Sequence, residues 1–146
     1  MNASPLQLTE YFLTELSFSA NSQFQAEKGT GLNPNEFQVA TEAQADKDKN
    51  RNWKVVIKLQ YQPPADANTP YRFSVEILGF FLVLNGYPEE KIERLVKVNG
   101  PSMLYGALRE IVKAVTLRGP YGAIILPSPS FYIPEPPPKA PAQQPK

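Results

Sequence analysis

Four segments in the first half of the chain alternate apolar and polar side chains with a period of two. They span residues 6–18, 36–45, 53–62 and 71–77. Strict alternation is typical of strands that bury one face in an antiparallel sheet. In the first segment it predicts that the even-numbered residues point inward, with Tyr11 and Leu13 on the outward face. No other feature constrains the fold as strongly, because a slip of one residue would turn every apolar side chain to the wrong face.

The connections predict how these segments are arranged. Residues 46–52 and 63–70 are short and polar, as hairpins require, so the last three segments form a meander. The first connection, residues 20–35, is longer and carries Gly29 and Gly31, which suits a crossover.

A helical period replaces the alternation in the second half. Residues 88–95 predict a short helix, and residues 101–118 predict a longer one between Pro101 and Gly119. The fold class is therefore α+β: a four-stranded antiparallel sheet, a meander with a crossover after the first strand, packed by one long C-terminal helix.

The longer helix is apolar on two sides. One stripe is suited to covering the sheet and consists of Leu104, Leu108, Ile111 and Val115. A second stripe contains Tyr105, Val112 and Leu117, and a single sheet cannot cover both. The second stripe therefore predicts self-association.

The C-terminus departs from globular composition. Residues 134–146 contain six prolines, and their apolar residues are otherwise alanines. We expect a folded domain at residues 1–133 and a disordered or polyproline-II tail at 134–146. Such a tail is either an inert spacer or a ligand for an aromatic-lined groove.

Composition excludes several classes of function. The chain has no His and no Cys, which removes the usual zinc sites, Ser-His or Cys-His nucleophile pairs and disulfides. A formal net charge of +1 gives no field that would attract nucleic acid. Neither a signal peptide nor a membrane span is predicted, so a cytoplasmic location is expected. No phosphate loop or paired catalytic group is recognisable, and the chain is predicted to be no enzyme and to hold no cofactor or metal.

Apolar residues also occur where a small monomer has little use for them. Phe24 and Leu32 lie in the crossover connection, and Tyr121, Phe131 and Tyr132 follow the long helix. Together they indicate either additional core or an apolar groove or oligomer face.

Three motifs in the C-terminal half resemble the SecB protein-export chaperone family. They are Asn-Gly-Pro-Ser-Met-Leu-Tyr-Gly-Ala-Leu-Arg-Glu at 99–110, Leu-Arg-Gly-Pro-Tyr at 117–121 and Leu-Pro-Ser-Pro-Ser-Phe-Tyr-Ile at 126–133. Further likenesses are Tyr-Phe-Leu-Thr-Glu-Leu-Ser-Phe-Ser-Ala-Asn at 11–21, Leu-Asn-Pro at 32–34 and Gly-Phe-Phe-Leu-Val at 79–83. The family carries a Pro-x-x-Leu helix start, an Ala-Arg-Glu in the middle of the helix and an Arg-Gly stop.

The resemblance implies a homotetramer, a dimer of dimers, and a holdase without ATPase activity that binds unfolded or precursor polypeptides. It implies a client groove formed by Phe24, Leu32, Phe37, Tyr121 and Phe131. For the oligomer interface we expect Tyr11, Leu13, Tyr105, Val112 and Leu117. The client is either an export precursor or a dedicated client such as an antitoxin. The alternative is a non-catalytic adaptor or structural oligomer that keeps the fold and binds a specific partner.

One departure from the family concerns its export motor, SecA. The family docks SecA through acidic residues on the sheet surface. Of the corresponding positions here only Glu15 is acidic, whereas Ser19, Arg72 and Ser74 are not. Docking to SecA is therefore in doubt.

Overall fold

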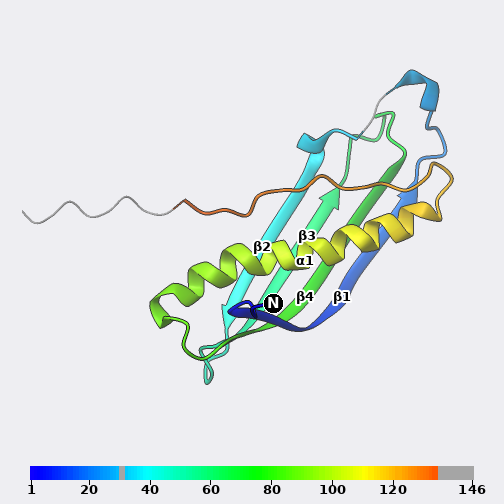
Figure 1. Ribbon diagram of the computed structural model, residues 1–146. Coiled ribbons are helices and arrows are strands. Elements are labelled where there is room, and N and C mark those ends of the chain that lie inside the picture. The colour runs from blue at the N-terminus through cyan, green and yellow to red at the C-terminus, as the bar shows by residue number, and fades with distance from the viewer. Residues whose placement is uncertain (30–31, 135–146) are drawn as a thin grey trace, which may run out of the picture.

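The alternating segments form one antiparallel sheet, and a single long helix crosses one of its faces (Figure 1). The computed structural model describes residues 1–29 and 32–134. The strands and the α-helix are β1 (Leu6–Ala20), β2 (Phe37–Ala45), β3 (Asn52–Tyr61), β4 (Tyr71–Val83) and α1 (Ile92–Leu117). The 3-10 turns are η1 (Ala26–Lys28), η2 (Pro34–Glu36) and η3 (Glu89–Lys91). The strand order is β1-β4-β3-β2, so the predicted meander and crossover are confirmed. The tail predicted for 134–146 lies, except for Pro134, outside the described residues.

The two central strands supply most of the core. Side chains of β3 and β4 alternate between buried and more exposed positions, as the period of two requires. The register pairs Ile57 with Ile77 and Leu59 with Val75, and all four side chains are buried. α1 packs on these strands and contributes buried residues such as Leu104 to the core.

Two bulges interrupt the long edge strand β1. Its pairing with β4 passes over Thr9 and again over Thr14. The Thr9 hydroxyl donates to the Phe80 carbonyl at 3.0 Å, and the Thr14 hydroxyl donates to the Glu76 carbonyl at 3.2 Å. These side chains bond to β4 at the points where the backbone ladder is irregular. Each bulge adds one residue and exchanges the faces of the residues that follow it.

The bulges correct the predicted faces of β1. Tyr11 pairs with Gly79 and Leu13 pairs with Ile77, which places both side chains on the helix side of the sheet. Phe12, predicted to point inward, lies on the opposite face. The prediction is wrong between the bulges because period-two alternation assumes an uninterrupted ladder.

The middle of β1 stays exposed on both faces. Exposed fractions are 48% for Tyr11, 45% for Phe12, 45% for Leu13 and 44% for Leu16. Val39 of β2, the other edge strand, is also exposed. α1 crosses the sheet as a single rod and leaves these edge positions uncovered (Figure 1).

α1 is one continuous helix, where the sequence predicted a break before Pro101. Proline removes a backbone donor and costs about 3 kcal/mol inside a helix. Here Gly100 and Pro101 are both buried, and the Ser102 hydroxyl donates to the Val98 carbonyl at 3.1 Å. Burial against the sheet therefore offsets the cost, and the helix continues from Ile92 to Leu117.

Two glycines allow the helix to approach the sheet closely. A Cβ atom at Gly79 would lie 2.6 Å from Leu104 Cδ2, and one at Gly100 would lie 3.1 Å from Val55 Cγ2. Each glycine therefore accommodates an apolar side chain of the facing layer. Glycine is unfavourable in a strand interior. Its presence at position 79 is explained by the close packing of Leu104, which leaves no room for a Cβ atom.

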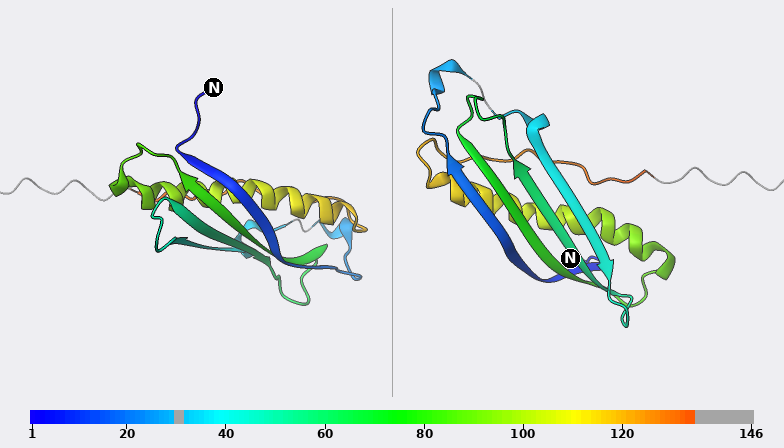
Figure 2. Two further views of the ribbon diagram at one scale, coloured as in Figure 1. Left: turned by 90° about the horizontal axis from the view of Figure 1, so that it is seen from below. Right: turned by 180° about the vertical axis from the view of Figure 1, so that it is seen from behind.

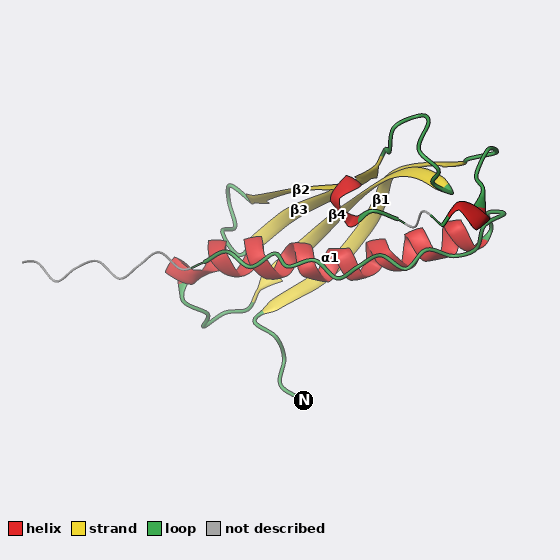
Figure 3. Cartoon of the chain, turned by 90° about the horizontal axis from the view of Figure 1, so that it is seen from above, coloured by secondary structure: helices red, strands yellow, loops and turns green. Residues whose placement is uncertain are grey.

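The chain then turns back along the helix. Residues 119–133, named here the return segment, run beside α1 over the same face of the sheet, while the opposite face of the sheet carries no helix from the described residues (Figures 2 and 3). Ile124 and Leu126 of the return segment are buried, and the Ile124 N–H donates to Thr116 Oγ1 at 2.8 Å. Neither α1 nor any other helix in the described part of the chain combines the length and apolarity needed to cross a bilayer.

Candidate functional site

Aromatic side chains join the crossover connection to the return segment. The rings of Phe24 and Tyr121 meet edge to face with centroids 4.9 Å apart, and Tyr121 also lies 5.7 Å from the Tyr71 ring. The Tyr121 hydroxyl donates to the Asn21 carbonyl at 2.5 Å, and its N–H donates to the Tyr71 hydroxyl at 2.8 Å. Two segments that lie about a hundred residues apart in the sequence are thus held together by contacts at the surface.

A second aromatic group lies where β2 begins. Phe37 stacks on Tyr61 at a centroid distance of 4.5 Å, and both rings lie within about 6 Å of Phe73. Leu32 is half-buried and packs against the same core. Phe37 is therefore a partly exposed ring that packs on the buried rings of Tyr61 and Phe73, and Leu32 is a partly exposed residue that packs on the core.

The hydroxyl of Tyr61 is unusual within this group. It is fully buried and makes no hydrogen bond of ordinary geometry among the described residues, although Thr69 and Glu36 lie near enough to shift its pKa. Burial raises the pKa of this hydroxyl, and the neighbouring Glu36 carboxylate raises it further. A buried polar group without a partner costs roughly 1–3 kcal/mol.

Removing this hydroxyl is expected to stabilise the fold. Tyr61→Phe keeps the ring stacked on Phe37 and deletes the unpaired group, so the free energy of unfolding should rise by about 1 kcal/mol. Urea unfolding followed by circular dichroism measures the change. The control is Tyr71→Phe, because the Tyr71 hydroxyl donates to the Gly122 carbonyl at 3.0 Å and its loss should destabilise. A loss of stability in Tyr61→Phe would show that the hydroxyl has a partner.

Phe131 makes a third, separate contact further along the helix. Its ring meets Tyr105 edge to face at 5.9 Å, and the Tyr105 hydroxyl donates to the Pro127 carbonyl at 2.6 Å. Burial raises the pKa of Tyr105. Arg109 donates to the Ser128 hydroxyl at 3.2 Å. The return segment is therefore fastened to the polar edge of α1 as well as to its apolar stripe.

The five predicted groove residues thus fall into three places on one side of the molecule. Phe24 contacts Tyr121. Phe37 is the first residue of β2, and Leu32 lies in the connection before it. Phe131 lies beside Tyr105. All five are at least partly exposed. The structure brings two of them into ring contact and does not merge the five into one pocket.

Two of the predicted interface residues prove to belong to the core. Tyr105 is 6% exposed and Val112 is 2% exposed within one chain, and Phe131 and Pro127 of the return segment contact Tyr105. The prediction that these two face another copy is corrected accordingly. Leu117 is 66% exposed, and Tyr11 and Leu13 are exposed on β1, so these three remain available at the surface.

Sequence reasoning missed an apolar group on the opposite face of the sheet. Phe12 and Phe80 meet edge to face at 6.4 Å, and Leu82 is exposed nearby on β4. The run Tyr11-Phe12-Leu13 was the available signal, since three consecutive apolar residues cannot all face one side of a regular strand. It indicated apolar side chains on both faces of the strand, and only Tyr11 and Leu13 were assigned to the outward face.

Glu15 lies on the same outer face. Its carboxylate pairs with Lys58 Nζ at 3.1 Å and accepts a hydrogen bond from the Ser74 hydroxyl at 3.2 Å. The hydrogen bond from Lys58 is the main reason that the pKa of Glu15 is lowered. An exposed pair of this kind contributes little to stability. The pairing also neutralises the one acid expected to dock a motor protein.

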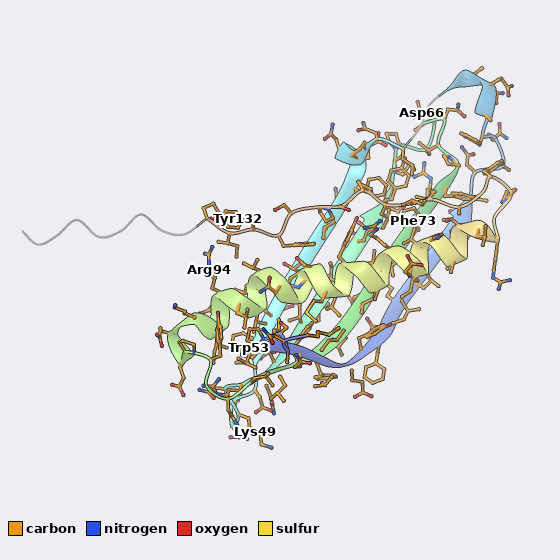
Figure 4. All side chains as sticks on the ribbon, viewed as in Figure 1. Lys49, Trp53, Asp66, Phe73, Arg94 and Tyr132 are labelled. Carbon is orange, nitrogen blue, oxygen red and sulfur yellow. The ribbon has the colours of Figure 1, made fainter. Side chains whose placement is uncertain are left out.

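Two further features of the described residues concern metal ligands and a cation–π contact at the surface. No cluster of three or more Asp, Glu, His or Cys in residues 1–29 and 32–134 could hold a metal ion. Arg94 lies over the Tyr132 ring at 5.7 Å and donates to the Ile133 carbonyl, next to a pocket of about 410 Å³ (Figure 4). These two contacts of Arg94 attach the end of the return segment to α1.

An antiparallel sheet in the order β1-β4-β3-β2 with one long helix on a single face is the fold of SecB-like proteins. The model of the family described as "Preprotein translocase subunit SecB" matches residues 1–132, and the chain belongs to this family. Its fold is similar to that of a Mycobacterium tuberculosis SecB-like chaperone in complex with a ChAD peptide from the HigA1 antitoxin. The TM-score is 0.60 at 19% identity, over 90% of this chain and 93% of that one. A Streptococcus agalactiae protein of unknown function matches with a TM-score of 0.46 at 18% identity, over 86% of this chain and 99% of that one. No curated protein sequence matches the chain.

Proposed function

We propose that the chain is an ATP-independent holdase that binds unfolded polypeptides on the side of the molecule formed by α1, the crossover connection and the return segment. The observation that carries the proposal is the surface contact between Phe24 and Tyr121 in a chain of the SecB family. The Phe24 and Tyr121 rings are partly exposed, and their mutual contact can be exchanged for contacts with client side chains. Burying one large client side chain contributes roughly 1.5–3 kcal/mol, without demanding a particular sequence.

The client is an export precursor or a dedicated unstable protein. The Mycobacterium tuberculosis relative, which binds an antitoxin peptide, supports the dedicated client. The Lys58 pairing of Glu15 favours it as well, because it leaves the outer face without a free acid at that position for SecA. The activity requires no cofactor and no catalytic step. The cytoplasmic location remains a prediction.

Self-association through β1 is part of the same proposal. β1 is a long edge strand, and its exposed Tyr11, Leu13 and Leu16 would promote aggregation if left uncovered. Antiparallel pairing with β1 of a second copy about a two-fold axis would join two sheets and cover these residues. The exposed Leu117 at the end of α1 is available for contact between such dimers.

The direct test is suppression of aggregation. An aggregation-prone protein is diluted from denaturant with and without a stoichiometric amount of the full chain, and light scattering is followed without ATP. We expect scattering to fall to a small fraction of the unprotected level. Unchanged scattering, together with no binding of an unfolded peptide, would contradict the proposal.

A further inference from the structure

Phe12 and Phe80 form an aromatic pair on the face of the sheet that α1 leaves bare. Their rings meet edge to face at 6.4 Å, and both side chains are exposed. Tyr11 and Leu13 flank Phe12 in the sequence, lie on the helix side of the sheet and are exposed as well. The edge strand β1 therefore carries three consecutive exposed apolar residues, one on the outer face and two on the helix side.

The hydrogen-bond pattern shows which peptide groups of β1 point to the free edge of the sheet. Among the described residues, β4 is the only strand that pairs with β1. Peptide groups in an antiparallel pair point alternately toward the partner strand and away from it. Just beyond β4, the Leu84 N–H donates to the Pro5 carbonyl at 2.8 Å, so even-numbered positions of β4 face β1 with their peptide groups. Phe12 pairs with such a position, whereas Tyr11 and Leu13 pair with odd-numbered ones and direct their peptide groups to the free edge.

A second copy that pairs antiparallel with β1 about a two-fold axis must meet two conditions. Residues directly opposite each other lie on the same face of the joined sheet, and free peptide groups must meet free peptide groups. Both conditions exclude a register in which Tyr11 lies opposite Phe12 of the second copy, because the two differ in face and in the direction of their peptide groups. The two-fold axis therefore passes at a single residue, which lies opposite its own counterpart.

The axis at Phe12 is the register that gives each of the three apolar residues an apolar neighbour. It places Tyr11 opposite Leu13 of the second copy on the helix side, and the two copies of Phe12 opposite each other on the outer face. With the axis at Tyr11, Phe12 would lie opposite Glu10, and with the axis at Leu13 it would lie opposite Thr14 of the bulge. An axis at Glu10 would bring two like charges together, which is unfavourable.

We propose that β1 pairs with β1 of a second copy in this register, with Phe12 on the two-fold axis. The outer face of the joined sheet then carries one cluster of four rings, formed by Phe12 and Phe80 from each copy. The second copy thereby completes an aromatic pair that one chain leaves exposed. This inference rests on the self-association proposed above and specifies its axis and its paired residues.

Cysteine crosslinking tests the register directly, because the chain has no cysteine of its own. The full-length variants Phe12→Cys, Tyr11→Cys and Leu13→Cys are oxidised mildly and separated by non-reducing electrophoresis. In the proposed register the two copies of position 12 form a pair without hydrogen bonds, with Cα atoms about 4.5 Å apart and within reach of a disulfide. The two copies of position 11, and likewise of position 13, are diagonal neighbours at about 7–8 Å, which is too far.

We therefore expect Phe12→Cys to give a dimer of twice 16.3 kDa as its main product, and Tyr11→Cys and Leu13→Cys to remain mainly single chains. A mixture of Tyr11→Cys and Leu13→Cys should crosslink after subunit exchange, because these positions lie directly opposite each other. Both variants of the mixture keep Phe12, so this result does not depend on how well Phe12→Cys assembles. Ile125→Cys, at an exposed residue of the return segment, measures crosslinking by random collision.

The outcomes separate the register from the assembly itself. Dominant crosslinking of Tyr11→Cys alone or of Leu13→Cys alone would move the axis and overturn the register, while self-association would stand. Crosslinking no faster than that of Ile125→Cys, in a chain that light scattering shows to be oligomeric, would place the contact away from β1. A monomeric mass of the unaltered chain would overturn the self-association and the register together, whereas holdase activity is measured independently by suppression of aggregation.

Discussion

Replacing Phe24 and Tyr121 together by serine is expected to abolish most of the holding activity. The two rings contact each other at the surface, and each should contribute roughly 1.5 kcal/mol or more to client binding. Since 1.4 kcal/mol corresponds to tenfold in affinity, the dissociation constant for an unfolded client should rise roughly a hundredfold. Fluorescence anisotropy of a labelled unfolded peptide measures this change.

The control for this variant is Tyr132→Ser, an exposed aromatic residue on the same return segment. It should leave client affinity unchanged within about twofold. Circular dichroism must show that the double variant keeps its fold, because Tyr121 also donates hydrogen bonds to Asn21 and Tyr71. A folded double variant with unaltered client affinity would place the client surface elsewhere.

Leu13→Asp is expected to dissociate the assembly at the β1 edge. Leu13 is half-exposed on the helix side of that strand, so the monomer tolerates a charge there. In the proposed dimer the carboxylate would be buried without a partner, and a desolvated charge of this kind costs several kcal/mol. Light scattering should show the mass falling to the 16.3 kDa of one chain.

The matched control is Ile125→Asp, at an equally apolar and more exposed residue on the return segment. This variant should keep the assembly of the unaltered chain. If Leu13→Asp and Ile125→Asp both retain the mass of the unaltered assembly, β1 is not the interface.

The strands that pack against the helix were predictable from the sequence, and the edge strand was not. β3 and β4 are buried on one face throughout, so their alternation directly reports the direction of each side chain. In β1 the hydrophobic pattern is reset twice, at Thr9 and Thr14. A bulge depends on the partner strand, which the local sequence does not contain. The sequence pattern therefore assigned Tyr11, Phe12 and Leu13 to the wrong faces of the sheet.

The helix and the candidate site also depend on contacts with distant segments, which the local sequence does not contain. Local propensity predicts a break at Pro101, but tertiary burial against Val55 and the sheet overrides it. The aromatic residues of the site were identifiable because they stood in connections where no core was expected. Which of them meet could not be predicted, since Phe24 and Tyr121 are far apart in the sequence and meet only because α1 ends beside the crossover connection.

The most direct measurement is the solution mass of the full chain by light scattering, with and without a stoichiometric, permanently unfolded polypeptide. A SecB-type holdase should have a mass that is a multiple of 16.3 kDa and should gain the mass of the bound polypeptide without ATP. A chain that stays at 16.3 kDa and leaves the unfolded polypeptide free would contradict both the assembly and the holdase function.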